Sequence, residues 1–257
     1  MKKGIKIRKK NKQFKKLKIA DFQTGKLPAV AVSIIESDFQ KIVKQIAIAN
    51  NASCDLIEWR VDFFISKFKT IPSLNELKVI AKSTNKPMIF TWRTFEEGGQ
   101  APFKLEMYLE LYRRAVASNF QVLDIEYRHF NLLRTFISEV EGEIPIICSW
   151  HDFNHVSKSL LSQGIKMSQT GAEIIKVAVM PQTSSEVDLF LKETKKLNNR
   201  ISQPLISVAM GSKAQNTRLI GYKFGSSLTF GSLKDPSAPG QYNVEILRRQ
   251  LNELNRL

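Results

Sequence analysis

Several polar residues interrupt apolar stretches of this chain, and they are the first candidates for chemistry. The clearest is Lys176, which stands inside the apolar run 174–179. A lysine in such a run is seldom buried without a partner. It is either a salt-bridged or snorkelling lysine, or a nucleophilic amine whose pKa is lowered by desolvation and by nearby cations such as Arg93 or Arg60.

His151 lies in the segment SWHDF, directly after an apolar run. An imidazole titrates near neutral pH, so it can both take and return a proton. An isolated histidine is as often structural, but a partner such as Lys176 on the next strand favours acid–base catalysis. His151 and His155 also have the spacing of a zinc helix. Asp152 stands where such a site needs a glutamate, and the pair starts at a strand end, so we expect no metal site.

These residues must be positioned by short, β-branched, apolar runs that recur with helical patterns between them. The predicted strands are 29–34, 55–60, 87–92, 122–126, 144–149, 174–179, 205–209 and 227–230. Strands nearly continuous in apolar residues are typical of a parallel sheet buried on both faces. Eight such units predict a single (β/α)8 TIM barrel. A doubly wound sheet would need a glycine-rich turn after its first strand, which this chain lacks.

In a barrel of this kind the active site lies at the carboxyl ends of the strands. Polar residues gather at those positions here. Glu58 and Arg60 share one face of the second strand, Arg93 ends the third with Glu97 following, and Asp124 and Glu126 share a face of the fourth. Because buried unpaired charges are costly, so many charges at one barrel mouth indicate a polar ligand.

Arg218 is a candidate anion site. It falls in the first turn of a predicted helix over 217–224, where free N–H groups and a bidentate guanidinium favour a carboxylate. The segment 231–240 contains two glycines and two prolines, which is the composition of a mobile lid or of an exposed connecting loop.

The charge of the chain is concentrated at its start. The formal net charge of the 257 residues is +15, and the first eighteen residues hold ten basic residues and no acidic one. We expect a solvated basic arm or hairpin over 1–18, followed by a barrel domain over 19–257; nucleic-acid binding by the arm is the weaker interpretation. No apolar run is long enough to cross a membrane, and Cys54 and Cys148 are expected to be buried free thiols of a cytoplasmic protein.

From about Ala29 to its end, the sequence resembles the type I 3-dehydroquinate dehydratases of the shikimate pathway. Five motifs carry the resemblance, in the family's order: EWRVDFF (58–64), FTWRTFEEGG (90–99), SWHDF (149–153), KVAVMPQ (176–182) and FGSLKDPSAPGQ (230–241). The resemblance implies a (β/α)8 barrel, usually a homodimer, that uses no metal or other cofactor. It implies dehydration of 3-dehydroquinate to 3-dehydroshikimate, on the route to chorismate and the aromatic amino acids.

The resemblance also implies a role for each matching residue. Lys176 would form the Schiff base, His151 would move the protons, and Glu97 would orient the imidazole. The substrate-binding residues would be Ser33, Glu58, Arg60, Arg93, Met210, Arg218, Phe230 and, in a closing loop, Ser237, Ala238 and Gln241.

Two residues depart from the family's pattern, and one rival enzyme shares its central residue. Ala214 and Thr217 stand where the family usually has a glycine and a serine, so closure of the loop before Arg218 is open to question. A Schiff-base aldolase on the same barrel would use the same lysine. It would normally bind a phosphate, and no glycine-rich phosphate loop follows the last two predicted strands.

Overall fold

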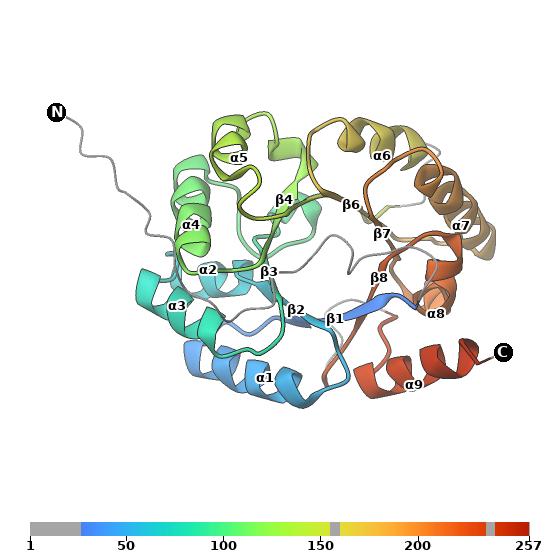
Figure 1. The fold of residues 1–257 in the computed structure, drawn as a ribbon, viewed down its shortest axis with the longest axis horizontal. Coiled ribbons are helices and arrows are strands. Elements are labelled where there is room, and N and C mark those ends of the chain that lie inside the picture. The colour runs from blue at the N-terminus through green and yellow to red at the C-terminus, as the bar shows by residue number, and fades with distance from the viewer. Residues whose placement is uncertain (1–26, 155–159, 235–239, 257) are drawn as a thin grey trace.

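A computed structural model describes residues 27–154, 160–234 and 240–256 of the chain, in which strands and helices alternate (Figure 1). The strands are β1 (Ala29–Ile34), β2 (Leu56–Arg60), β3 (Met88–Thr91), β4 (Val122–Glu126), β5 (Ile146–Asp152), β6 (Ile174–Val179), β7 (Leu205–Ala209) and β8 (Leu228–Gly231). The helices are α1 (Phe39–Asn51), α2 (Asp62–Phe68), α3 (Leu74–Lys82), α4 (Leu105–Ala117), α5 (Arg134–Val140), α6 (Leu160–Ser168), α7 (Ser184–Asn198), α8 (Thr217–Ile220) and α9 (Val244–Leu254).

All eight strands are parallel and form one sheet in the order β7-β6-β5-β4-β3-β2-β1-β8. The sheet closes where β7 meets β8, and the helices surround it (Figure 1). This closure is sparse: Leu205 forms an isolated bridge with Ser226, and the Ser227 amide donates to the Leu205 carbonyl over 2.7 Å. The predicted (β/α)8 barrel is therefore confirmed.

Side chains alternate between the two faces of each strand, and this alternation separates the core from the site. Outward residues such as Val32, Trp59 and Val177 are fully buried in one large core between the sheet and the helices. Inward residues in the lower part of the barrel are also apolar, for example Ile147 and Ile206. Above them the inward positions carry polar side chains, so the upper barrel is available for a ligand.

Local capping sets where several helices begin. The Ser73 hydroxyl accepts from the Glu76 amide, and the Glu76 carboxylate accepts from the Ser73 amide, so a complete capping box starts α3. The Asp38 carboxylate caps α1 in the same way, by accepting from two backbone amides. These caps satisfy amide groups that a helix start would otherwise leave unpaired.

The bounds of β2, β3 and β8 differ from the predicted ones by one residue at one or both ends, and two other predicted elements differ by more. The fifth strand begins at Ile146 and continues to Asp152, so His151 lies within β5 instead of after it. The predicted helix over 217–224 is only the short α8 followed by a 3₁₀ turn over Gly221–Phe224. The backbone N–H of Arg218 already donates to the Gln215 carbonyl, so it is not free to bind an anion.

The predicted basic arm over 1–18, and with it the start of the barrel domain at residue 19, lies outside the described residues. None of the helices in the described ranges has the length and apolar content needed to cross a membrane. Cys54 and Cys148 are free and buried, as predicted.

Candidate active site

The carboxyl ends of the strands surround a cavity of about 140 Å³. Eleven of the residues predicted from the sequence line it: Ser33, Glu58, Arg60, Arg93, Glu97, His151, Lys176, Met210, Arg218, Phe230 and Gln241. They come from every strand of the barrel except β4, or from the loops that follow those strands. The other two predicted residues, Ser237 and Ala238, lie outside the described residues, as does His155.

Lys176 projects from the middle of β6 and is 5% exposed. Its Nζ donates to Glu58 Oε1 over 3.1 Å and to Asp124 Oδ2 over 2.9 Å, and lies 5.2 Å from the centroid of the Phe230 ring. The sequence led us to expect arginines beside this amine. Instead, its direct contacts are two carboxylates, and Arg93 reaches it only through one of them, because Arg93 also binds Asp124.

Glu58 holds its position through neighbours on both sides of β2. Its Oε2 accepts from the Ser33 hydroxyl over 2.6 Å, and its Oε1 accepts from the Thr91 hydroxyl over 3.3 Å. Burial by itself opposes ionisation, but the charges of Lys176 and Arg60 outweigh burial and lower the pKa of Glu58. An ionised carboxylate therefore faces the cavity next to the amine.

Asp124 does not line the cavity and is fully buried. Its Oδ1 accepts from Arg93 Nη2 over 2.7 Å and from the Ser149 hydroxyl over 2.6 Å, which leaves Oδ2 for Lys176. Burial by itself would raise the pKa of Asp124, but the charges of Arg93 and Lys176 together outweigh burial and lower this pKa to about 2. Asp124 is thus a buried anion shared by two cations.

His151 and Glu97 form a pair at the cavity wall. The Nδ1 atom of His151 lies 2.8 Å from Glu97 Oε2. Burial, followed by the positive charges of Arg93 and Lys176, lowers the pKa of His151 well below its ordinary value. Burial raises the pKa of Glu97 to about 8 despite the opposing charge of Arg93. The imidazole is accordingly uncharged at neutral pH and can accept a proton.

The loop that carries Glu97 packs closely against the segment after β5. Gly98 has a φ of +79°, and a Cβ at this position would lie 2.3 Å from the Phe153 ring. Only glycine fits both the left-handed backbone and the close approach of the ring. This packing fixes the distance between Glu97 and His151.

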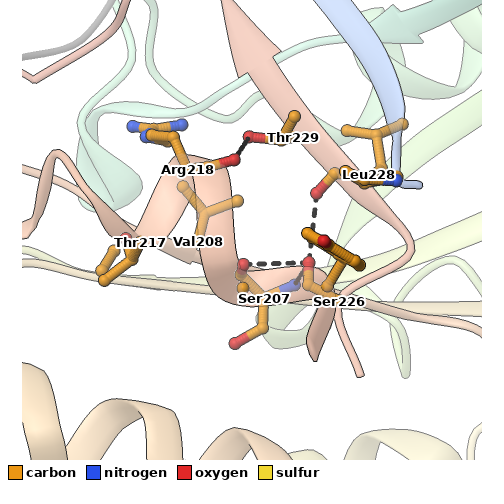
Figure 2. A pocket seen from close by; sticks show the side chains of 11 residues that line it. Ser207, Val208, Thr217, Arg218, Ser226, Leu228 and Thr229 are labelled. Carbon is orange, nitrogen blue, oxygen red and sulfur yellow. Dashed lines mark hydrogen bonds between the residues drawn. The ribbon is translucent and has the colours of Figure 1, made fainter. Parts of the chain in front are cut away.

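Arg218 lies on α8, beside a small cavity of about 10 Å³ between β7 and β8 (Figure 2). It is 4% exposed, and neither its Nε nor its Nη2 has a hydrogen-bond partner among the described residues. Burial lowers its pKa to about 10, so the guanidinium is still charged at neutral pH. A buried, charged guanidinium with unpaired N–H groups is suited to binding an anion.

Comparisons with known proteins identify the relatives of this chain. The family model described as type I 3-dehydroquinase matches residues 30–257. The 3-dehydroquinate dehydratase of Clostridium kluyveri is 34% identical over 244 residues, which is 91% of this chain and 96% of that protein. The chain belongs to the type I 3-dehydroquinase family.

Further relatives and solved structures agree with this assignment. The 3-dehydroquinate dehydratase of Enterococcus faecalis is 32% identical over 87% of this chain and 91% of its own length. The crystal structure of that enzyme from Geobacillus kaustophilus superposes with a TM-score of 0.81 at 27% identity, covering 89% of this chain and 91% of that one. The type I enzyme from Clostridium difficile, solved with covalently modified comenic acid, superposes with a TM-score of 0.80 at 30% identity, covering 91% and 94%.

As a type I 3-dehydroquinase the chain is a hydro-lyase, and its reaction is the dehydration step of the shikimate pathway. This class of reaction excludes the aldolase alternative. The zinc alternative depends on His155, about which the structure says nothing; within the described ranges no three side chains of metal-binding type come together.

The departures at Ala214 and Thr217 do not disturb the backbone of this type I 3-dehydroquinase. Ala214 is buried in a 3₁₀ turn (Ser212–Ala214), and its φ is not positive, so its Cβ adds no backbone strain. The Thr217 hydroxyl donates to the Ala214 carbonyl over 2.6 Å. Threonine therefore supplies a hydroxyl that ties the turn to the helix carrying Arg218.

Besides Asp124, sequence reasoning assigned no role to two further buried carboxylates that hold other site residues in this 3-dehydroquinase. Asp62 accepts from Arg60 Nε over 2.7 Å and from Arg60 Nη2 over 2.8 Å. Glu126 accepts from Arg93 Nη1 over 3.1 Å and from the Thr94 amide over 2.7 Å. The only sequence signal for them was a charge at an inward or strand-end position, which does not say what the charge binds.

Proposed function

We propose that this chain dehydrates 3-dehydroquinate to 3-dehydroshikimate through an imine on Lys176, with His151 as the proton carrier. The observation that carries the proposal is that one cavity combines a buried amine, an imidazole whose pKa is lowered, and an arginine with two nitrogens that have no hydrogen-bond partner among the described residues. Those three groups match a ketone, an acidic C–H bond and a carboxylate, all of which 3-dehydroquinate carries.

The first step is condensation of the amine with the C3 ketone. The ammonium gives up protons as its nitrogen bonds to C3, and the ketone oxygen leaves as water, so ammonium and ketone become iminium and water without a change in charge. Glu58 and Asp124 lie within hydrogen-bond reach of Nζ to take and return these protons. The iminium then draws electrons from the neighbouring C2–H bond and makes that proton acidic.

His151 removes the C2 proton in the second step. For its Nε2 to act as the base, its Nδ1 must carry the proton and donate to Glu97 Oε2, which lies 2.8 Å away; the proton that Glu97 holds near neutral pH is then on its other oxygen, Oε1. The enamine formed in this way expels the C1 hydroxyl, and the imidazolium protonates the departing oxygen to give water. Hydrolysis of the imine releases 3-dehydroshikimate and restores Lys176.

Arg218 binds the substrate carboxylate, and Glu58, Arg60 and Arg93 bind its hydroxyls. The unpaired N–H groups of Arg218 support this orientation, since a bidentate carboxylate would satisfy both. Ser33, Met210, Phe230 and Gln241 complete the walls. From the family resemblance, Ser237 and Ala238 are two further substrate-binding residues. The relative solved with covalently modified comenic acid supports covalent chemistry in this family.

The experiment that tests the proposal is reductive trapping. Borohydride is added together with 3-dehydroshikimate, and the adduct is located by peptide mass spectrometry. We expect the adduct on Lys176 and none in Lys176→Ala. A matched control is Lys86→Ala, because Lys86 is also partly buried but donates to backbone carbonyls outside the cavity. An adduct on another lysine, or full activity in Lys176→Ala, would refute the proposed mechanism.

The remaining features have two sources. From the family resemblance, the active form is a homodimer without a metal or other cofactor; from the sequence itself, it is a cytoplasmic protein without a nucleic-acid or membrane partner. Light scattering coupled to size-exclusion chromatography measures the mass in solution, and a mass of one chain would contradict the homodimer.

A further inference from the structure

We propose that Asp124 is the counter-ion of the iminium that forms on Lys176, and that Glu58 is released to the substrate when the iminium forms. This inference rests on the proposed function, because it concerns an intermediate of that reaction. It assigns a task to a residue that does not line the cavity and that sequence reasoning left without one.

The argument begins with the number of N–H groups on the lysine nitrogen. The free ammonium has three, and two of them reach Glu58 and Asp124 over 3.1 and 2.9 Å. After condensation the nitrogen is bonded to its own side chain, to the substrate carbon and to one hydrogen. The iminium therefore keeps a single N–H, and only one of the two carboxylates can remain its hydrogen-bond partner.

The surroundings of Asp124 favour it as the partner that stays. It is fully buried, and its Oδ1 is held by Arg93 Nη2 over 2.7 Å and by the Ser149 hydroxyl over 2.6 Å. With these two bonds in place, Oδ2 cannot turn away from Nζ without breaking a charge-assisted contact. Because Asp124 does not line the cavity, a substrate hydroxyl in the cavity does not compete for it directly.

The surroundings of Glu58 favour its release. Glu58 lines the cavity, so its carboxylate can reach a substrate hydroxyl once Nζ is occupied. Its other contacts are hydroxyls, Ser33 at 2.6 Å and Thr91 at 3.3 Å, both of which can rotate to follow a small movement. A carboxylate freed in this way is available to accept from the substrate.

A fixed counter-ion has a chemical consequence. The iminium is the electron sink of the reaction only while it is protonated, and an anion in contact favours the protonated form. The charged or titratable side chains around this nitrogen come from four strands or their loops, β2 to β5: Glu58, Arg60, Arg93, Glu97, Asp124, Glu126 and His151. Of these, Asp124 alone combines direct contact with Nζ and complete burial.

The test is trapping with cyanoborohydride, which reduces a protonated imine but not a neutral one. The trapped fraction on Lys176 is measured by intact mass over a range of pH with saturating 3-dehydroshikimate. In Asp124→Asn the pH at which trapping falls to half should move downward by about 1–3 units, the shift expected when an opposite charge in contact is removed. At low pH the variant should still be trapped.

Two variants make the comparison specific. Glu126→Gln removes a fully buried carboxylate from the same strand that contacts Arg93 but not Lys176, and it should shift the midpoint much less. Glu58→Gln should also leave the midpoint near its original value, while raising KM. If Glu58→Gln shifts the midpoint and Asp124→Asn does not, Glu58 is the counter-ion and the inference is wrong.

Folding and the underlying mechanism are controlled separately. If Asp124→Asn does not fold, Ser149→Ala removes one of the bonds that hold Asp124 and should shift the midpoint in the same direction by a smaller amount. An unchanged midpoint in a folded Ser149→Ala variant would then count against the inference. Absence of any adduct in the unaltered protein would instead refute the imine itself.

Discussion

Replacing Arg218 with methionine should weaken substrate binding and at the same time stabilise the free protein. Methionine has a similar length and no charge, so the substitution removes the guanidinium with little change in packing. Loss of one partner from a buried, hydrogen-bonded charge pair costs about 2–5 kcal/mol. At about 1.36 kcal/mol per factor of ten, KM should rise by roughly 30- to 5000-fold.

The gain in stability follows from the pKa of Arg218. Burial lowers this pKa from 12.5 to about 10. Each pKa unit corresponds to about 1.36 kcal/mol, so burying the charged side chain costs about 3 kcal/mol. At pH 7 the guanidinium is charged in the folded and the unfolded chain, and the full cost is present. Arg218→Met should therefore raise the free energy of unfolding by up to about 3 kcal/mol.

Urea unfolding and steady-state kinetics on the same samples measure both effects. Arg60→Met is the matched control, because Arg60 is also a cavity arginine but is paired with the buried Asp62. Its removal leaves a buried carboxylate without its cation, which should destabilise the fold by about 3–5 kcal/mol. Equal destabilisation of the two variants would show that Arg218 has a partner in the folded protein. An unchanged KM in Arg218→Met would show that Arg218 does not bind the substrate carboxylate.

Four further predictions concern the proton carrier, pH, the arm and metals. His151→Ala should lower kcat by about 10²- to 10⁴-fold, yet borohydride should still trap an adduct on Lys176. A normal kcat in this variant would show that His151 does not carry the proton. Because folding raises the pKa of Glu97 to about 8, the folded chain holds a proton that the unfolded chain loses at lower pH, so stability should fall as pH rises to 8. Folding lowers the pKa of His151, which makes stability rise with pH below pH 6.5 and so opposes the effect of Glu97 there. The fall in the free energy of unfolding is therefore clearest from pH 6.5 to 8, where urea unfolding should show a loss of up to about 2 kcal/mol. An equal fall in Glu97→Gln would show that Glu97 is not its cause. Deleting residues 1–18 should leave kcat largely intact, and a collapse of kcat in a folded deletion variant would show that the arm helps to build the site. Activity should also survive a metal chelator, and a loss that zinc restores would revive the zinc alternative.

Short, nearly continuous apolar runs made the strands predictable. The bounds of β1, β4, β6 and β7 agree with those predicted from the sequence, because each is a short β-branched run buried on both faces. The carboxyl end of β5 was missed because Trp150, His151 and Asp152 do not continue the apolar run. They are strand residues nevertheless, since they pair with β6 in register, His151 with Ala178.

The positions of the site residues were easier to predict than their partners. Strand-end position indicated His151 and Arg93, and a charge inside an apolar run indicated Lys176; all three line one cavity. The contact between Lys176 and Asp124 joins β6 to β4 across the barrel interior, and no local pattern in the sequence encodes which inward charges meet. The same limit applies to Arg218, whose lack of a partner among the described residues is a property of tertiary packing alone.

The sparse closure between β7 and β8 should make this seam the first part of the barrel to exchange its amide hydrogens. There the Ser207 amide donates to the Ser226 hydroxyl over 2.9 Å, and that hydroxyl donates in turn to backbone carbonyls (Figure 2). A hydroxyl rotates more easily than a backbone ladder separates, so local opening costs less free energy here. Arg218 borders the seam, and its carbonyl accepts from the Thr229 hydroxyl of β8. An anion bound to Arg218 should therefore slow deuterium uptake in both strands and stabilise the closure of the barrel.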